Sequence, residues 1–332
     1  MSNDASTFSV VVTCYNYRQY VREAVDSALA QRLKPLEVIV VDDGSTDGSR
    51  EQLAESYGES AGVKLLFKNN GGQLSAFIAG VAECKGDIIC FLDADDVWEL
   101  DYLERLSATY REHPETDFVF SNLRFFGKHE GLWHSETQDR DYGLTALVAL
   151  FRQYWIGSPT SALTMRREVA TCVLDLPVAF YADWRVRADD CLVYGASVLG
   201  ARKRYMATIA GRYRSHASNA WFSRRDAHDR VVKLRHLYRV QRLLAYYRNA
   251  WGFDCNSLRY AKLEFQTRTL PTREEVRLYL DLIGRSPLSS IKKLEHSFSV
   301  IRHYWRQRHS GTAPSPEQLT KVSASQRGSP VS

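Results

Sequence analysis

The chain has 332 residues, of which 44% are apolar, 12% aromatic and 25% charged, and its net charge is +5. This length suits one large α/β domain with a smaller appendage, and the apolar content excludes a globally disordered chain. The charge is uneven, since residues 1–220 hold 23 Lys and Arg against 30 Asp and Glu, whereas residues 221–309 hold 19 against 8. An acidic first part is therefore followed by a basic segment.

Strands alternate with helices over the first part of the chain. In chain order, the pattern predicts strand 8–13, helix 20–31, strand 37–41, helix 46–57, strand 63–67, helix 73–84 and strand 87–92. Thr46 or Asp47 can cap the second helix. Largely apolar strands are buried on both faces, as in parallel sheets covered by helices. The predicted fold class is therefore α/β, with a mostly parallel, doubly wound nucleotide-binding sheet.

The later part of the chain is less regular. It predicts, in order, helix 101–112, strand 117–126, helix 142–154, an extended segment 159–165 and helix 189–199. From about residue 223 the pattern is helical and basic, with a stripe formed by Val231, Leu234, Leu237, Tyr238, Gln241 and Leu244. Residues 310–332 are rich in Ser, Pro, Thr and Gln and predict a disordered tail. The expected division is a domain at 1–222, a basic helical appendage at 223–309 and a tail at 310–332.

Polar residues stand where the first strands end. Thr13, Asp43, Gly71 and Asp95 each fall at or just past a predicted strand end. In open parallel sheets, ligands bind beyond the carboxyl ends of the strands. Four loops should therefore converge on one crevice.

The acidic cluster Asp93, Asp95 and Asp96 follows the fourth strand. Neighbouring carboxylates repel one another unless a cation neutralises them, and Mg²⁺ and Mn²⁺ prefer oxygen ligands and bridge to phosphates. The cluster therefore indicates a metal site that holds a diphosphate. The alternative is a turn before a helix that Asp96 or Asp101 caps.

The loops after the first two strands suggest a nucleoside site. Asp43 can accept a hydrogen bond from a base or a ribose hydroxyl, or shape an Asx-turn, and both roles are compatible. The sequence has no G-x-x-x-x-G-K-[ST] loop, and no G-x-G-x-x-G follows the first strand. These absences exclude P-loop phosphate chemistry and count against a dinucleotide oxidoreductase. Tyr15, in the place of those glycines, either stacks on a base or packs under the first helix.

Four runs together resemble a known family. They are SVVVTCYN at 9–16, VDDGSTD at 41–47, NGG at 70–72 and FLDADD at 91–96. Their order and spacing are similar to the family 2 glycosyltransferases, which have the A-type nucleotide-binding fold, and the resemblance is dense over residues 8–105 and thinner to about 220. It implies an inverting transfer from a nucleoside-diphosphate sugar, with UDP favoured over dTDP or GDP, that depends on Mn²⁺ or Mg²⁺.

The resemblance also implies roles for single residues. On the nucleotide-sugar side it points to Thr13, Tyr15, Asp43, Gly71 and Asp93, with Asp43 reading the base and Asp93 near the ribose. Asp95 would bind the metal, with Asp93 and His216 as further ligands. The acidic pair Asp189–Asp190 resembles the pair that supplies the catalytic base, although the first member is Asp rather than the usual Glu. We expect Asp190 to be the base and Asp189 to contact the acceptor or orient its neighbour; the alternative is that both merely favour a helix N-terminus.

The sequence also departs from the family. The Q-x-x-R-W motif and the membrane helices of processive polysaccharide synthases are absent, so we expect addition of a single sugar. An Arg that the family often has near position 76 is replaced by Ala76, Phe77 and Ile78, which leaves the diphosphate without that contact. Two other classes of function are a non-catalytic nucleotide-sugar-binding scaffold and a nucleotidyltransferase. The first would be favoured by loss of Asp95 or Asp190, and the second by a Gly-rich N-terminal loop.

The expected acceptor is a glycan, a lipid-linked sugar or a cell-surface polysaccharide. The appendage 223–309 predicts contact with an anionic membrane or a homodimer rather than with nucleic acid, and a solvated helical face is the alternative. Its segment 291–305 places a stripe of apolar residues beside basic ones: Leu294, Phe298, Ile301 and Trp305 beside Lys292, Lys293, Arg302 and Arg306. The polar N-terminus and the absence of C-x-x-C spacing predict a cytoplasmic protein, peripheral at the inner face of the membrane.

Overall fold

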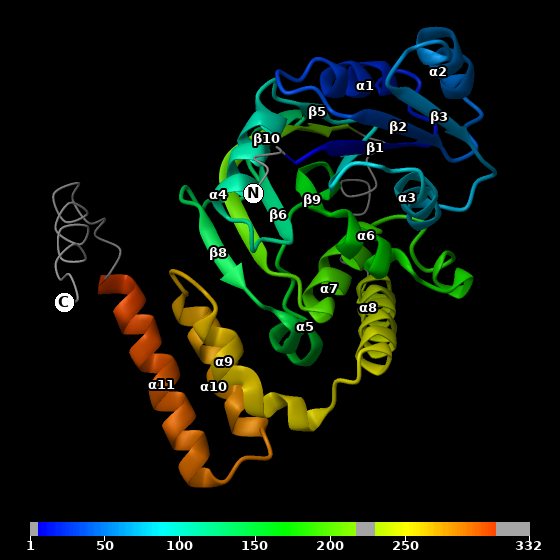
Figure 1. The fold of residues 1–332 in the computed structure, drawn as a ribbon. Helices are drawn as coiled ribbons and strands as arrows, with labels where there is room; N and C mark the ends of the chain where they lie inside the picture. Colours follow the sequence, from blue (N-terminus) through cyan, green and yellow to red (C-terminus); the bar gives the residue numbers. More distant parts are fainter. Residues whose placement is uncertain (1–5, 217–229, 310–332) are drawn as a thin grey trace, which may run out of the picture.

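The computed structural model describes residues 6–216 and 230–309, and its centre is a ten-stranded mixed sheet with helices on both faces (Figure 1). Strands and helices alternate in the first part: β1 (Phe8–Cys14), α1 (Val21–Leu29), β2 (Glu37–Asp42), α2 (Ser49–Tyr57), β3 (Val63–Phe67), α3 (Gln73–Ala82) and β4 (Ile88–Asp93). The predicted order of these seven elements is confirmed, with small shifts at their ends.

The second part mixes short strands and helices. It contains β5 (Val97–Trp98), α4 (Tyr102–Glu112), β6 (Phe118–Gly127), β7 (Gly131–Leu132), β8 (Arg140–Gly143), α5 (Ala146–Arg152), η1 (Thr160–Ala162), β9 (Leu163–Arg166), α6 (Arg167–Leu174), η2 (Val178–Phe180), α7 (Asp189–Leu199) and β10 (Lys203–Ser215). The remaining described elements are helical: α8 (Arg230–Ala250), η3 (Cys255–Tyr260), α9 (Ala261–Gln266), α10 (Arg273–Arg285) and α11 (Ser290–His309).

The strand order β3-β2-β1-β4-β9-β6-β10-β5 joins two differently built halves. The first four strands along the chain pair in parallel, as predicted. Beyond β4 the sheet is mixed, because β9 runs antiparallel between β4 and β6 while β10 is parallel to β6. The parallel register sets Thr13 opposite Asp93 and Cys14 opposite Asp42, so the polar strand ends lie along one edge of the sheet.

Alternate strand residues enter two hydrophobic cores, one on each face of the sheet. On β1, Val11 packs on the side of α3, α6 and α7, whereas Val10 and Val12 pack on the side of α1, α2 and α4. Figure 1 shows these two helix layers above and below the sheet. This is the doubly wound arrangement that the apolar strands predict.

Three local predictions were wrong or incomplete. The helix expected at 142–154 begins only at Ala146, because residues 140–143 form strand β8 and pair with β10. The segment 159–165 is not extended throughout, since η1 precedes β9. Helix α2 has Gly48 at its N-cap, not Thr46 or Asp47, although the Asp47 carboxylate still accepts from the backbone N–H of Ser49 at 3.0 Å.

Helix α8 differs from its predicted stripe. Of the six residues named for that stripe, only Leu244 is buried, and the helix instead packs through Val240, Leu243, Leu244 and Tyr247. The Tyr247 hydroxyl donates to the Val173 carbonyl of α6 at 2.7 Å, so the second half of α8 is anchored to the main domain. The domain boundary at 222 stays a prediction, and the predicted tail at 310–332 lies outside the described residues.

The six cysteines all lie in described parts of the chain, and none of them is in a disulfide bond. Among the described helices, none combines the length and apolar character needed to span a bilayer.

Candidate active site

A cavity of about 710 Å³ opens beyond the carboxyl ends of β1, β2 and β4. Its walls come from segments far apart in the sequence, which the sheet and the start of α7 bring together. Of the predicted site residues, those that line it are Thr13, Tyr15, Asp43, Asp93, Asp95, Asp189 and Asp190. Gly71 and His216 adjoin this wall through hydrogen bonds to Asp43 and Asp95, respectively. One cavity therefore collects three of the four residues expected from the strand-end loops, Thr13, Asp43 and Asp95, and the fourth, Gly71, adjoins its wall.

Asp43 is buried, and most of its acceptor capacity is used by the protein. Oδ1 accepts from the Lys68 ammonium at 2.5 Å and the Gly71 N–H at 2.9 Å, and Oδ2 accepts from the Gly72 N–H at 2.7 Å. The loop before α3 is thereby fixed against the end of β2. Because a carboxylate oxygen has two acceptor positions, Oδ2 retains one that a ligand N–H can use.

Thr13 and Tyr15 lie on the β1 side of the cavity. The Thr13 hydroxyl donates to Asp93 Oδ1 at 3.3 Å. Tyr15 is 48% exposed, so it does not pack under the first helix, and that interpretation was wrong. Its ring instead faces the cavity, where a planar group can stack on it.

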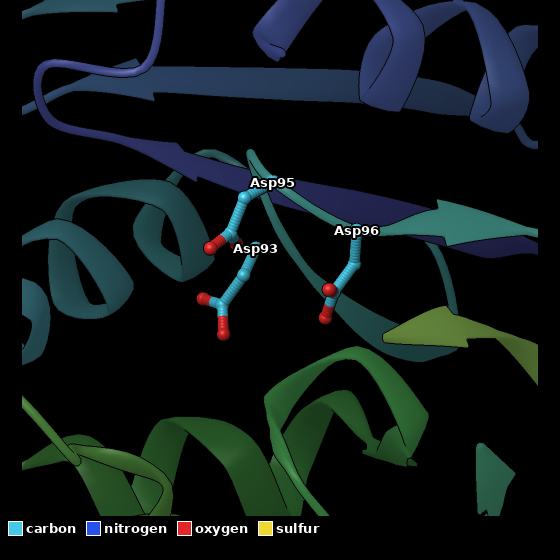
Figure 2. A group of neighbouring side chains, drawn as sticks. All are labelled: Asp93, Asp95 and Asp96. Atoms are coloured by element: carbon cyan, nitrogen blue, oxygen red, sulfur yellow. The ribbon is translucent and has the colours of Figure 1, made fainter. Parts of the chain in front are cut away.

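The acidic turn after β4 holds three carboxylates with ligand atoms within 4.8 Å of one another. Figure 2 shows the Asp93 and Asp95 carboxylates close together, with Asp96 set to one side. Each Asp96 oxygen accepts a hydrogen bond from the protein, one from the Ser161 hydroxyl at 2.6 Å and one from the Arg214 N–H at 2.9 Å, and Asp96 does not line the cavity. Asp96 therefore shapes the turn, and Asp93 and Asp95 are the carboxylates that face the cavity.

The alternative interpretation of this turn as a helix cap does not hold. Strand β5, not a helix, follows Asp96. Asp101 does stand at the N-cap of α4, but its side chain makes no capping hydrogen bond and pairs with Arg105 instead.

Burial and mutual repulsion disfavour negative charge in the cluster. Burial, with the neighbouring charge of Asp95, raises the pKa of Asp93 to about 7, and the same two causes raise the pKa of Asp96. A divalent cation would offset this repulsion, and hard oxygen ligands at this spacing fit Mg²⁺ or Mn²⁺. The donor set therefore fits the predicted metal site.

His216 reaches the same cluster from the end of β10. Its Nε2 lies 2.9 Å from Asp95 Oδ2, and the rings of Tyr17 and Tyr20 pack around it. The Arg214 guanidinium donates to the Asp95 backbone carbonyl at 2.8 Å, which fixes β10 against the acidic turn. The structure thus brings His216 and Asp95 together, and the role of His216 as a metal ligand stays a prediction.

The pair Asp189–Asp190 opens helix α7 on another wall of the cavity. Asp190 is 2% exposed, and its Oδ2 lies 3.5 Å from Arg187 Nη2 and 3.6 Å from His236 Nε2. Burial, followed by the charge of Asp189, raises the pKa of Asp190 to about 7. The carboxylate can therefore exchange a proton near neutral pH.

Gln73 links the two acidic sites and was missed from the sequence. Its side-chain N–H donates to Asp93 Oδ1 at 3.0 Å, and its Oε1 accepts from the Ala188 N–H at 2.9 Å. One side chain thereby spans the distance from the acidic turn to the start of α7. The only feature of the sequence that could have marked Gln73 as a site residue is its position directly after the Asn70–Gly71–Gly72 run.

Other cavity residues were also missed: Tyr17, Trp133, Trp155, Arg185, Arg187, Tyr194, Tyr213 and His236. Arg185 donates to the Asn70 side chain, and with Arg187 it brings positive charge to a cavity whose α3 wall lacks the family's Arg. The loop that carries Arg185 lies close against Gly72. A Cβ at Gly72, whose φ is +87°, would lie only 2.5 Å from the Arg185 Cα, so this approach requires glycine. Arg185 and Arg187 could have been predicted as cavity residues from their position just before Asp189, whereas no sequence pattern indicated His236 on α8.

Comparisons with known proteins agree with this arrangement. The family described as Glycosyl transferase family 2 matches residues 9–173, which include the acidic turn but not Asp189, Asp190 or His216. An uncharacterized glycosyltransferase of Nostoc sp. is 33% identical over 223 residues, which is 66% of this chain and 68% of that protein. Hyaluronan synthase of Pasteurella multocida is 40% identical over 102 residues, covering 31% of this chain but only 10% of that protein.

Solved structures show the same fold. The crystal structure of S. aureus TarS has a TM-score of 0.51 and 18% identity, over 90% of this chain and 54% of that one. A shorter TarS structure, of residues 1–349, has a TM-score of 0.50 and 17% identity, over 90% of this chain and 89% of that one. Since the Nostoc relative is matched over two thirds of its length and the family match covers β1 to α6, the protein belongs to glycosyltransferase family 2.

Proposed function

We propose that the enzyme transfers a sugar from a nucleoside-diphosphate sugar to a hydroxyl of a glycan, lipid-linked or cell-surface polysaccharide acceptor, with inversion at the anomeric carbon. UDP is the favoured nucleotide, with dTDP and GDP as alternatives. The observation that carries the proposal is one cavity with three chemical parts: a nucleoside side at Thr13 and Asp43, the carboxylates Asp93 and Asp95, and the buried Asp190.

The donor would lie along the β1, β2 and β4 ends. Asp43 Oδ2 keeps an acceptor position for a base N–H, and the exposed ring of Tyr15 offers a stacking surface. Asp93 and Asp95, with His216, would hold the divalent cation. When bound, such a cation neutralises the negative charge that develops on a leaving diphosphate. Arg185 and Arg187 add fixed positive charge to the same cavity.

Asp190 is the base in this proposal. A sugar hydroxyl is a poor nucleophile at neutral pH unless a base takes its proton as the new bond forms. The acceptor oxygen bonds to the anomeric carbon, the bond from that carbon to the diphosphate oxygen breaks, and Asp190 receives the hydroxyl proton. The diphosphate leaves with the bonding electrons. One such displacement inverts the anomeric centre, and Gln73 keeps the donor and base walls in a fixed relation.

A donor screen tests this function. The purified protein is incubated with UDP-, GDP- and dTDP-sugars and a panel of sugar acceptors, and release of nucleoside diphosphate is measured with Mn²⁺ and with excess EDTA. We expect release with at least one donor, its loss in EDTA and its loss in Asp95→Asn. Asp101→Asn is the control, because Asp101 pairs with Arg105 away from the cavity. Full activity in EDTA would contradict the metal site.

A further inference from the structure

Helix α11 presents a continuous apolar face to solvent. Its large apolar side chains recur three and four residues apart, so they lie along one side of the helix within an arc of about 80°. Their exposed fractions run from 39% at Ile301 to 81% at Ile291, and the full set is Ile291, Leu294, Phe298, Ile301 and Trp305. A patch of this size and order is unusual on a surface that meets only water.

The opposite side of α11 fixes how the helix sits. Val300 is fully buried, Tyr304 is nearly so, and the His303 Nε2 lies 3.0 Å from the Arg268 carbonyl oxygen. The side chain of Gln266 on α9 also donates to the Ser299 hydroxyl at 3.0 Å. Figure 1 shows α9 and α10 between α11 and the rest of the molecule, so the apolar face points away from the protein.

Basic residues flank the apolar face. Helix α11 carries five Lys and Arg side chains against the single acid Glu295. At 100° per residue, Arg302 and Arg306 fall on one border of the apolar arc, with Glu295 between them, and Arg308 falls on the other border. The helix therefore combines a row of aliphatic and aromatic side chains with borders whose net charge is positive.

We propose that α11 docks this protein on a lipid bilayer with acidic headgroups, with its axis in the plane of the surface and its apolar face at the boundary between headgroups and acyl chains. Phe298 and Trp305 enter that boundary, and the arginines at the border contact the lipid phosphates. A second copy of the chain is disfavoured as the occupant, because pairing two such faces would bring borders of net positive charge together. The proposal concerns a surface away from the cavity and does not depend on the donor or on the base.

Vesicle sedimentation of the full-length protein tests the proposal. Wild type should bind mixed phosphatidylcholine–phosphatidylglycerol vesicles at least about tenfold more than pure phosphatidylcholine vesicles, and high salt should weaken this binding. Phe298→Glu should lower binding to the mixed vesicles about tenfold. Val178→Glu is the matched control, because Val178 is 73% exposed but lies on η2, outside α11, and this variant should bind as wild type does.

Thermal unfolding should be the same for wild type and Phe298→Glu, since this side chain is exposed. Equal sedimentation with both kinds of vesicle, or unchanged binding by Phe298→Glu, would overturn the proposal. Light scattering provides a second test. A wild-type dimer that becomes a monomer in Phe298→Glu, without vesicle binding by either protein, would assign the apolar face to a second copy instead.

Discussion

Asp189 and Asp190 are adjacent on α7, yet their surroundings differ. Asp190 is almost fully buried, with Arg187 and His236 on its Oδ2, while Asp189 is only partly buried. Adjacent residues on a helix point about 100° apart, so the two carboxylates cannot present themselves to the acceptor in the same way. Asp190 is the one held in place by Arg187, which lies just before α7, and by His236 of α8.

The choice of base is tested by two matched variants. Asp190→Asn should lower kcat at least ~10²-fold, the low end of what a positioned base contributes, with little change in the KM for the donor. Asp189→Asn should have the smaller effect on kcat. Steady-state kinetics of both variants decide the point. Near-normal turnover in Asp190→Asn, together with a large loss of turnover in Asp189→Asn, would show that Asp189 and not Asp190 is the base.

The raised pKa of Asp190 predicts a pH profile. Only the ionised carboxylate can accept a proton, so with a pKa of about 7, kcat should fall as the pH drops below 7. Asp189, Arg187, Arg239 and His236 surround this group and would shift the midpoint if substituted. The profile is measured as kcat between pH 5 and 9, a range that brackets that pKa. A flat acidic limb in wild type would exclude Asp190 as the base.

The raised pKa of Asp190 also affects stability, but whereas kcat should rise with pH, the stability should fall. A carboxyl whose pKa is higher in the folded than in the unfolded state stabilises the folded state at a pH below its unfolded pKa of about 4. This stabilisation is lost as the pH rises through the folded pKa of about 7. Asp190→Asn should therefore be at least as stable as wild type at pH 8, which also controls for misfolding in the kinetic test.

How much of the site the sequence could predict depended on where each residue lies. Thr13 lies at the end of β1, Asp43 and Asp95 follow β2 and β4, and parallel strands bring their carboxyl ends to one edge. Gln73 and Arg185 act through contacts across loops, and no local pattern encodes those contacts. His236 is on a helix far along the chain, so only tertiary packing shows that it reaches Asp190.

Strands and helices were predictable where their pattern is long. The buried strands β1, β2 and β4 and the partly exposed edge strand β3 are read directly from their apolar runs, whereas β8 is four residues long and is defined by its pairing with β10. Its Arg140 is buried and paired with Glu275 of α10, a tertiary contact that no local sequence pattern shows. Pairing with β10 therefore placed residues 142 and 143 in a strand, although the sequence pattern assigned them to the start of a helix.

Helix α3 packs unusually close to the sheet, and this contact can be tested. A Cβ at Gly80 would lie 2.5 Å from Val11 Cγ1 and 3.1 Å from Val41 Cγ2. Both neighbours are stiff β-branched side chains, so Gly80→Ala should destabilise the fold by about 1–3 kcal/mol through overpacking. Urea denaturation measures the change.

Gly284→Ala is the matched control for this prediction. Gly284 lies in helix α10, it is exposed, and a Cβ there meets nothing within 4 Å. The substitution should stabilise the protein by about 0.5–1 kcal/mol, because alanine restricts the unfolded chain and favours the helix. A Gly80→Ala variant as stable as Gly284→Ala would contradict the close contact of α3 with β1 and β2.

As a whole, the molecule couples its basic C-terminal part to its catalytic half. Helix α8 packs on α6 and α7 and supplies His236 to the cavity, and the two sheet faces enclose separate cores. The predicted appendage therefore contributes to the candidate site as well as carrying the exposed helix α11. The sequence showed the change in charge at about residue 220 but not this packing.

Nucleotide binding tests whether the cavity is a metal-dependent donor site. UDP, GDP and dTDP are titrated calorimetrically into wild type, Asp95→Asn and Asp101→Asn, each with and without Mn²⁺. A bound cation bridges carboxylates and diphosphate, so Mn²⁺ should tighten binding of at least one nucleotide by about tenfold or more in wild type and in Asp101→Asn. The gain should vanish in Asp95→Asn. Equal dissociation constants with and without Mn²⁺ for all three nucleotides would contradict the account.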